Sequence, residues 1–269
     1  MSEKKTKGIL VVSFGTSYDL TREATIDVIE ADIARTFPDF QVYRAWTSQM
    51  IIQKLKKRDH VQIDTVCEAM ERMAADGITD VVVQPTHVVN GHENDQMKED
   101  ALSYAHLFSS LSIGDPLLTT EEDNETVVRT IAQEFSHLRP QEDALVLMGH
   151  GTTHYANAIY AALDYRFKDM DFPHIFLGTV EAYPGIEAVL RQVQEYGPRQ
   201  VVLAPFMIVA GDHATNDMAG DDPQSWLFQF RQAGFSVCPV LKGLGEYQGI
   251  RDLLISHVRE AMNGLDQIP

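Results

Sequence analysis

Two segments of this chain recur at long range, and this internal repeat constrains the fold more than any other feature of the sequence. Leu10–Ser17 (LVVSFGTS) is echoed by Leu145–Thr153 (LVLMGHGTT), and Val81–Gly91 (VVVQPTHVVNG) is echoed by Val201–Gly211 (VVLAPFMIVAG). In each half an apolar run with a glycine turn comes first, and an apolar run that meets a proline follows it. Two similar domains are the simplest explanation.

The repeat also sets the expected domain limits. We expect a first domain over residues 1–140 and a second over 141–246, although no proline- or serine-rich linker marks the boundary. A last helix, over about 247–262, has no counterpart in the first half, and we expect it to pack back on the first domain.

Short apolar runs alternate with segments of helical periodicity along the chain. Several runs are apolar almost throughout, which is typical of parallel strands covered on both faces. Asp222-Pro223 predicts a helix start. The alternation favours an α/β fold built on open parallel sheets. The expected strands are Gly8–Phe14, Gln41–Trp46, Asp80–Gln84, Ala144–Met148, Ile175–Val180, Gln200–Phe206 and Ser236–Pro239.

Charge and cysteine content exclude several classes of function. The formal net charge is −17 at pH 7, which argues against a nucleic-acid partner and against docking to an anionic membrane. Cys67 and Cys238 stand alone, so neither a disulfide framework nor a cysteine metal site is expected, and both are predicted to be small core residues. The apolar run Gly8–Phe14 is too short for a signal or spanning segment, so we expect a cytoplasmic protein.

Histidines and carboxylates gather where the predicted strands end, which is where open parallel sheets bind ligands. His150 stands in a Gly-His-Gly turn, Glu181 follows a β-branched run, and His213 stands in Gly-Asp-His. Each alone also fits a structural role, as a histidine in a tight turn or as a carboxylate that caps a helix. Together, two imidazoles and one carboxylate suit a first-row divalent ion such as cobalt, iron, nickel or zinc.

Other catalytic motifs do not fit the strand ends. The sequence has no phosphate-binding Gly-x-x-x-x-Gly-Lys-Ser/Thr run and no Gly-x-Ser-x-Gly nucleophile elbow. A basic cluster over 54–58 reads either as a solvated helix end or as a group that captures substrate carboxylates. Arg44, at the end of a predicted strand, is a second candidate for carboxylate capture.

The motifs resemble, nearly end to end and in their spacing, the anaerobic sirohydrochlorin cobaltochelatases, which are class II chelatases of cobalamin biosynthesis. The resemblance implies two Rossmann-like, chelatase-fold domains with the active site in the cleft between them. The segments that carry it are LVVSFGTS at 10–17, WTS at 46–48 with MII at 50–52, MGHG at 148–151, VEAYP at 180–184, and AGDHA at 210–214 with NDMA at 216–219.

The resemblance assigns roles residue by residue. The family's metal-binding residues fall on His150, Glu181 and His213, and His150 is the expected base for the two pyrrole protons. Within the repeat, Phe14 stands opposite His150 and Glu93 opposite His213. The expected substrate-binding residues are Phe14, Gly15, Thr16, His87, Glu93 and Tyr183, with Phe14 and Tyr183 as ring-stacking candidates.

One position departs from the family pattern, because His92 stands where an acidic residue is expected. This leaves open whether His92 and Glu93 take part in metal entry. The metal is itself a substrate, so no permanent cofactor is expected. The expected partners are a sirohydrochlorin-type tetrapyrrole and a divalent ion, and a homo-oligomer is left open.

Two alternatives remain at this point. A sirohydrochlorin ferrochelatase or nickel chelatase would keep the fold and change the ion, since ligand type does not separate Co²⁺ from Fe²⁺ or Ni²⁺. A non-catalytic carrier of tetrapyrrole or metal would bind without turnover.

Overall fold

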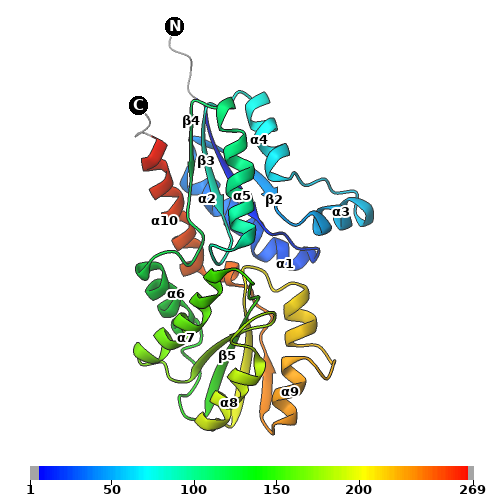
Figure 1. Ribbon diagram of the computed structural model, residues 1–269, viewed down its shortest axis with the longest axis vertical. Helices are drawn as coiled ribbons and strands as arrows, with labels where there is room; N and C mark the ends of the chain where they lie inside the picture. The colour runs from blue at the N-terminus through cyan, green and yellow to red at the C-terminus, as the bar shows by residue number, and fades with distance from the viewer. Residues whose placement is uncertain (1–5, 266–269) are drawn as a thin grey trace. The chain divides into compact units, whose positions relative to one another are not determined.

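The computed structural model describes residues 6–265, which form two compact units (Figure 1). Unit 1 combines the chain up to Thr119 with the chain from Arg251 onward, and unit 2 runs from Thr120 to Ile250. The boundary near residue 140 suggested by the repeat falls inside unit 2, in which helix α6 (Glu121–Glu134) contacts helix α7 (Ala158–Asp169). Within residues 6–265, no helix combines the length and apolarity needed to cross a membrane.

Each unit contains one four-stranded sheet in which all strand pairs are parallel. The strand order is β2-β1-β3-β4 in unit 1 and β6-β5-β7-β8 in unit 2, so both halves have the same topology. The expected α/β fold with two parallel-sheet domains is therefore confirmed. The strands are β1 (Lys7–Ser13), β2 (Phe40–Trp46), β3 (Asp80–Pro85), β4 (Ser110–Ile113), β5 (Asp143–Gly149), β6 (Ile175–Thr179), β7 (Gln200–Phe206) and β8 (Ser236–Pro239).

The chain direction switches beside the first strand of each sheet. From β5 the chain crosses to β6 on one side and later to β7 on the other, so that β5 lies between them. The carboxyl ends of β5, β6 and β7 consequently lie next to one another at the switch point, where α/β sheets bind their ligands.

In unit 1 helices cover both faces of the sheet, with α5 in front of it and α2 behind it in Figure 1. Apolar side chains of α4 and α5 pack with alternate residues of β1 and β3 in one core. The helices of this unit are α1 (Asp19–Ala24), α2 (Ile26–Thr36), α3 (Gln49–Arg58), α4 (Val66–Ala75), α5 (His92–Ser103) and α10 (Gln248–Leu265), with a short 3₁₀ turn at Ala105–Leu107.

Helix α10 is joined to the rest of unit 1 by polar contacts as well as apolar ones. Arg251 Nε donates to the buried carboxylate of Asp32 at 2.8 Å. Arg259 stacks its guanidinium over the ring of Phe37, with 5.6 Å between the guanidinium carbon and the ring centroid. A buried charge needs partners, and Asp32 has two, since Arg35 of α2 also bonds it at 2.8 Å; the pair with Arg251 ties α10 to that buried carboxylate.

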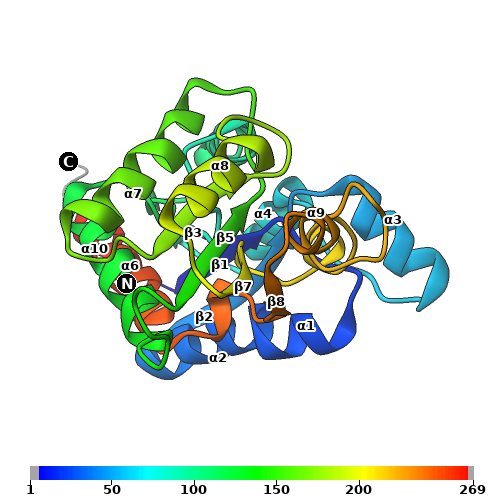
Figure 2. The same ribbon diagram turned by 90° about the horizontal axis from the view of Figure 1, so that it is seen from below.

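In unit 2 one face of the sheet packs on α8 and α9 through a core that includes Val189, Trp226 and Phe230. Figure 2 shows α7 and α8 covering β5. The helices are α6 (Glu121–Glu134), α7 (Ala158–Asp169), α8 (Ile186–Tyr196) and α9 (Trp226–Gln232), with 3₁₀ turns at Tyr155–Asn157 and Leu244–Glu246 and a π-helical turn at Ala214–Met218.

Two local predictions were wrong. Asp222-Pro223 does not start a helix, because Ser225 provides the N-cap of α9 and its hydroxyl accepts the N–H of Phe228 at 3.2 Å. Cys238 is exposed rather than in the core, because β8 is an edge strand with little cover. Cys67 is half-buried on α4.

Candidate metal site

The three predicted metal ligands come together in unit 2. His150 directly follows β5, Glu181 is the second residue after β6, and His213 follows β7 after a short loop. A backbone hydrogen bond links the two loops directly after the paired ends of β5 and β6, because Glu181 N–H donates to the carbonyl of His150 at 2.9 Å. The backbone thus holds the first two ligands side by side before their side chains are considered.

The donor atoms of the three side chains form a compact triangle. One ligand atom from each of His150, Glu181 and His213 lies within 4.8 Å of the other two. His150 Nε2 is 3.8 Å from Glu181 Oε1, and the two imidazole rings are edge to face with 4.7 Å between centroids. When ligand atoms surround an ion tetrahedrally at the usual zinc–nitrogen distance, they lie roughly 3.4 Å from one another. Small side-chain rotations would therefore close the triangle on an ion.

The site is open to solvent on one side. The exposed fractions of the side chains are 42% for His150, 54% for Glu181 and 34% for His213. Three protein donors with exposed faces leave further coordination positions for other ligands. Structural metal sites are usually closed, whereas catalytic sites keep such positions free.

Both histidines have their Nδ1 atom engaged, which leaves Nε2 for an ion. His150 Nδ1 lies 2.8 Å from the carbonyl oxygen of Gly151, and His213 Nδ1 lies 2.6 Å from Asp217 Oδ2. A carbonyl and a carboxylate oxygen only accept, so in both pairs Nδ1 carries the hydrogen and Nε2 has the free lone pair. Metal-binding histidines are commonly oriented in this way.

A tight turn positions His150. Gly151 has φ +88°, and a Cβ there would lie 2.9 Å from the backbone nitrogen of Ala182 and from the Cβ of Thr179. Only glycine combines that backbone conformation with that close approach. The turn brings the Gly151 carbonyl to the imidazole and presses the His150 loop against the Glu181 loop.

Asn157 ties these two loops together, and sequence reasoning missed it. Its Oδ1 accepts the N–H of Thr152 at 3.0 Å, and its Nδ2 donates to the carbonyl of Tyr183 at 2.6 Å. A single asparagine after a glycine turn carries no pattern that would have identified it. Its role depends on a fold that places the two loops side by side.

The π-helical turn at Ala214–Met218 carries His213 at its start. Ala214 and Met218 are fully buried in the unit 2 core, and Thr215 N–H donates to the Gly211 carbonyl at 3.0 Å. Single π-helical turns occur frequently at functional sites. Here the turn points the apolar side chains of Ala214 and Met218 into the core and brings the polar side chains of His213 and Asp217 into contact.

The remaining predicted site residues divide between the units. Tyr183 lies in unit 2 in the Glu181 loop and is 73% exposed. In unit 1, Phe14 is 42% exposed at the end of β1, and Thr16 is buried and accepts the N–H of Tyr18. Gly15 has φ +100°, and a Cβ there would clash with the Trp46 ring.

Glu93 and His92 lie at the start of α5. Both side chains are exposed in its first turn. His87, four residues after Val83 of β3, belongs to the same edge of the unit 1 sheet. These first-half residues do not contribute to the metal-ligand triangle, all of which lies in unit 2.

His87 is electrically neutral under ordinary conditions. Burial lowers the pKa of its imidazole to about 4, against a smaller opposite effect of the Asn94 side chain. Neither ring nitrogen has a hydrogen-bond partner within the described residues. A substrate role for His87 would therefore not be electrostatic attraction of carboxylates.

The half-buried His87, whose ring nitrogens are both shielded from solvent, makes unit 1 sensitive to acid. Because the pKa of His87 is lower in the folded state than its ordinary value of 6.5, the folded state binds fewer protons, and stability falls as the pH drops from 6.5 towards 4. From pH 7 to pH 5 this residue alone should remove about 2 kcal/mol from the free energy of unfolding. We expect His87→Gln to lose correspondingly less over that interval.

Urea unfolding at both pH values checks this expectation. A Trp226→Phe background leaves Trp46 of unit 1 as the only tryptophan of the chain, so its fluorescence reports that unit. An acid-induced loss of the same size with and without the His87→Gln substitution would contradict the assignment.

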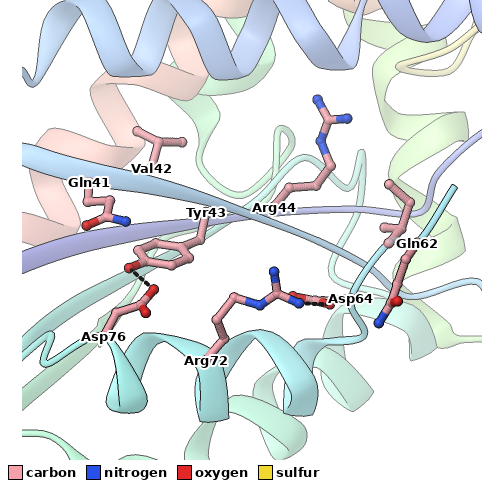
Figure 3. Close-up of a pocket in the computed structure, with 9 residues that line it drawn as sticks. Gln41, Val42, Tyr43, Arg44, Gln62, Asp64, Arg72 and Asp76 are labelled. Carbon is pink, nitrogen blue, oxygen red and sulfur yellow. Dashed lines mark hydrogen bonds and ion pairs between the residues drawn. The ribbon is translucent and has the colours of Figure 1, made fainter.

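The basic groups proposed to capture carboxylates are exposed or already paired. The 54–58 cluster forms the exposed end of α3. The Arg44 guanidinium bonds Glu30 and Asp27 of α2, and Figure 3 shows its side chain on the opposite side of β2 from Tyr43. The guanidinium of Arg44 is therefore already occupied by carboxylates of the protein and is not available to a substrate carboxylate.

A separate pocket of about 380 Å³ lies in unit 1 (Figure 3). Its polar groups bond one another: the Tyr43 hydroxyl donates to Asp76 and Arg72 donates to Asp64, both at 2.8 Å. Desolvation and the hydrogen bond to Asp76 raise the pKa of Tyr43. None of the metal-ligand candidates lines this pocket, whose lining residues are Gln41, Val42, Tyr43, Arg44, Gln62, Ile63, Asp64, Arg72 and Asp76.

Comparison with known proteins gives a consistent picture. The family model described as cobalt chelatase (CbiK) matches residues 7–263. The sirohydrochlorin cobaltochelatase of Salmonella typhimurium is 42% identical over 257 residues, covering 96% of this chain and 97% of that protein. The sirohydrochlorin cobaltochelatase CbiKC of Nitratidesulfovibrio vulgaris is 34% identical over 265 residues, covering 97% and 92%.

A solved structure shares the fold. SirB from Bacillus subtilis, determined with Fe³⁺, aligns with a TM-score of 0.67 at 13% identity and covers 98% of both chains. At that identity the likeness concerns the arrangement of helices and strands.

Proposed function

This chain belongs to the cobalt chelatase (CbiK) family and inserts Co²⁺ into sirohydrochlorin, and we propose that His150, Glu181 and His213 hold the ion during that reaction. The observation that carries the proposal is the triangle of donor atoms, all within 4.8 Å of one another. Two imidazoles and one carboxylate suit a first-row divalent ion. The ion is a substrate in this scheme, so the reaction needs no resident cofactor.

Insertion requires the ion to exchange its ligands for four pyrrole nitrogens while two N–H protons leave. Glu181 offsets part of the ion's charge, and the two Nε2 atoms replace part of its water shell. As the ion moves to the macrocycle, Nε2 of His150 loses its bond to the metal and becomes free to accept a proton. An imidazole near neutral pH is well suited to that step.

Proton removal has a short exit. Glu181 Oε1 lies 3.8 Å from His150 Nε2, and both side chains are about half exposed. A proton taken up by His150 can therefore pass to Glu181 or directly to water. The two protons released balance the two positive charges that the macrocycle receives.

We assign substrate contacts to groups at the strand ends. The rings of Phe14 and Tyr183 expose large apolar surfaces, which suits stacking on a flat macrocycle. Gly15, Thr16, His87 and Glu93 belong to the same proposal as the other first-half contacts. We place the reaction in cobalamin biosynthesis, as the family resemblance implies.

An absorbance assay tests the function. Anaerobic sirohydrochlorin is mixed with Co²⁺ and a tenth of an equivalent of protein, and the loss of the metal-free spectrum is followed against a protein-free control. We expect many turnovers per protein molecule. Metal insertion that stops at one equivalent, or proceeds at the control rate with the macrocycle bound, would instead indicate a carrier.

A further inference from the structure

The two histidines of the metal site are oriented by different kinds of acceptor. His150 Nδ1 faces the neutral carbonyl of Gly151 at 2.8 Å. His213 Nδ1 faces the Asp217 carboxylate at the shorter distance of 2.6 Å. Hydrogen bonds to a charged acceptor are shorter and about twice as strong as those between neutral groups. The two imidazoles are therefore inequivalent as ligands.

We propose that Asp217 is a positioning residue that orients His213 and makes it the stronger ligand of the pair. The inference rests on the proposed function. Asp217 accepts the Nδ1–H of His213, which fixes the ring and presents the Nε2 lone pair to the ion. A carboxylate at Nδ1 also raises the donor strength of Nε2, as carboxylate–histidine–metal arrangements do.

The fold fixes this pair through the π-helical turn. His213 and Asp217 are four residues apart, and the residues beside them, Ala214 and Met218, are buried in the core. Gly220 N–H donates to the Asn216 carbonyl at 3.1 Å and closes the turn behind Asp217. The carboxylate is held near the ring by packing on both sides of it, although Asp217 itself is 44% exposed.

The inequivalence divides the work between the histidines. His213 keeps the ion while ligands are exchanged, and His150, held only by a carbonyl, releases it first. That order agrees with the role of His150 as proton acceptor, which requires its Nε2 to become free. Asp217 acts through His213 and touches neither the ion nor the macrocycle.

Binding of Co²⁺ alone, without tetrapyrrole, tests the proposal on the intact protein. We expect Asp217→Ala to raise the dissociation constant for Co²⁺ by about 10- to 100-fold. The substitution should also change the position and intensity of the Co²⁺ d–d absorption bands. Asp217→Asn keeps an acceptor oxygen without the charge and should fall between. Asp221→Asn is the matched control, because it removes the same charge from an exposed residue on the same loop.

A double-mutant cycle with His213→Ala shows whether Asp217 acts through that ring. In the His213→Ala background, the further loss from Asp217→Ala should disappear. A loss that persists would overturn the proposal and make Asp217 a ligand in its own right. An equal loss in Asp221→Asn would overturn it in favour of net charge.

The cycle also separates this inference from the proposed function. If His213→Ala binds Co²⁺ as tightly as the wild type, the metal-site assignment fails and the role of Asp217 falls with it. If His213→Ala loses binding while Asp217→Ala keeps wild-type affinity and spectrum, only the positioning role is overturned. Thermal unfolding of each variant, read by circular dichroism, shows that the proteins compared are folded.

Discussion

Replacing His150 with alanine is expected to lower kcat/KM for cobalt insertion by at least about 1,000-fold. The change removes one of the three proposed metal donors and the nitrogen that we propose accepts the pyrrole proton. The side chain is 42% exposed and packs little apolar surface, so the unfolding transition should remain close to that of the wild type. Steady-state absorbance assays with sirohydrochlorin and Co²⁺ measure the rate, and fluorescence titration measures macrocycle binding.

His137→Ala is the control for this variant. His137 lies in unit 2 before β5, is exposed, and belongs to no part of the metal site. Its substitution should leave the insertion rate within about twofold of the wild type, by ordinary standards for a surface change. Retention of more than a tenth of wild-type activity in His150→Ala would show that another group removes the protons.

Replacing Gly151 with alanine is expected to damage the site without touching a ligand. At φ +88° an alanine is strained, and its Cβ would lie 2.9 Å from backbone and side-chain atoms of Ala182 and Thr179. The strain alone costs about 1–2 kcal/mol. Displacement of the Gly151 carbonyl also releases His150, and a misplacement of about 1 Å reduces catalysis by about 100-fold.

Gly197→Ala separates backbone strain from the close approach. Gly197 has φ +74° at the C-cap of α8, and a Cβ there meets nothing within 4 Å. This variant should lose stability, measured by urea unfolding, but keep wild-type insertion rates. If Gly151→Ala behaved in the same way, the contact between the His150 and Glu181 loops would have no part in catalysis.

The sequence predicts the sheets well because buried parallel strands are apolar over their whole length. Val201–Leu203 and Leu145–Leu147 have no polar side chains, and both lie in strands where expected. Strand β4 was missed because Ser110–Ile113 alternates apolar residues with serine instead of being apolar throughout. At an edge, a strand needs less apolar surface and leaves a weaker pattern.

The proposed metal ligands could be identified from the sequence for a topological reason, whereas the residues that position them could not. Strand-end positions follow from counting strands, and a parallel sheet places all the carboxyl ends along one edge. Asp217 and Asn157 act through contacts that depend on a π-helical turn and on two adjoining loops. Arg44 was misjudged because the two acids that bind it come from a helix well before it in the chain.

The backbone hydrogen bond between Glu181 and His150 lies directly beyond the paired ends of β5 and β6, so the sheet sets the starting positions of these two proposed ligands. Neighbouring strands stand about 4.8 Å apart, and this spacing sets the distance between the backbone positions from which the donor side chains extend. A spacing of this kind selects ionic radius only coarsely and does not distinguish Co²⁺ from Fe²⁺ or Ni²⁺. The fold therefore accepts divalent ions of similar radius, and the relative supply of these ions in the cell decides which one is inserted.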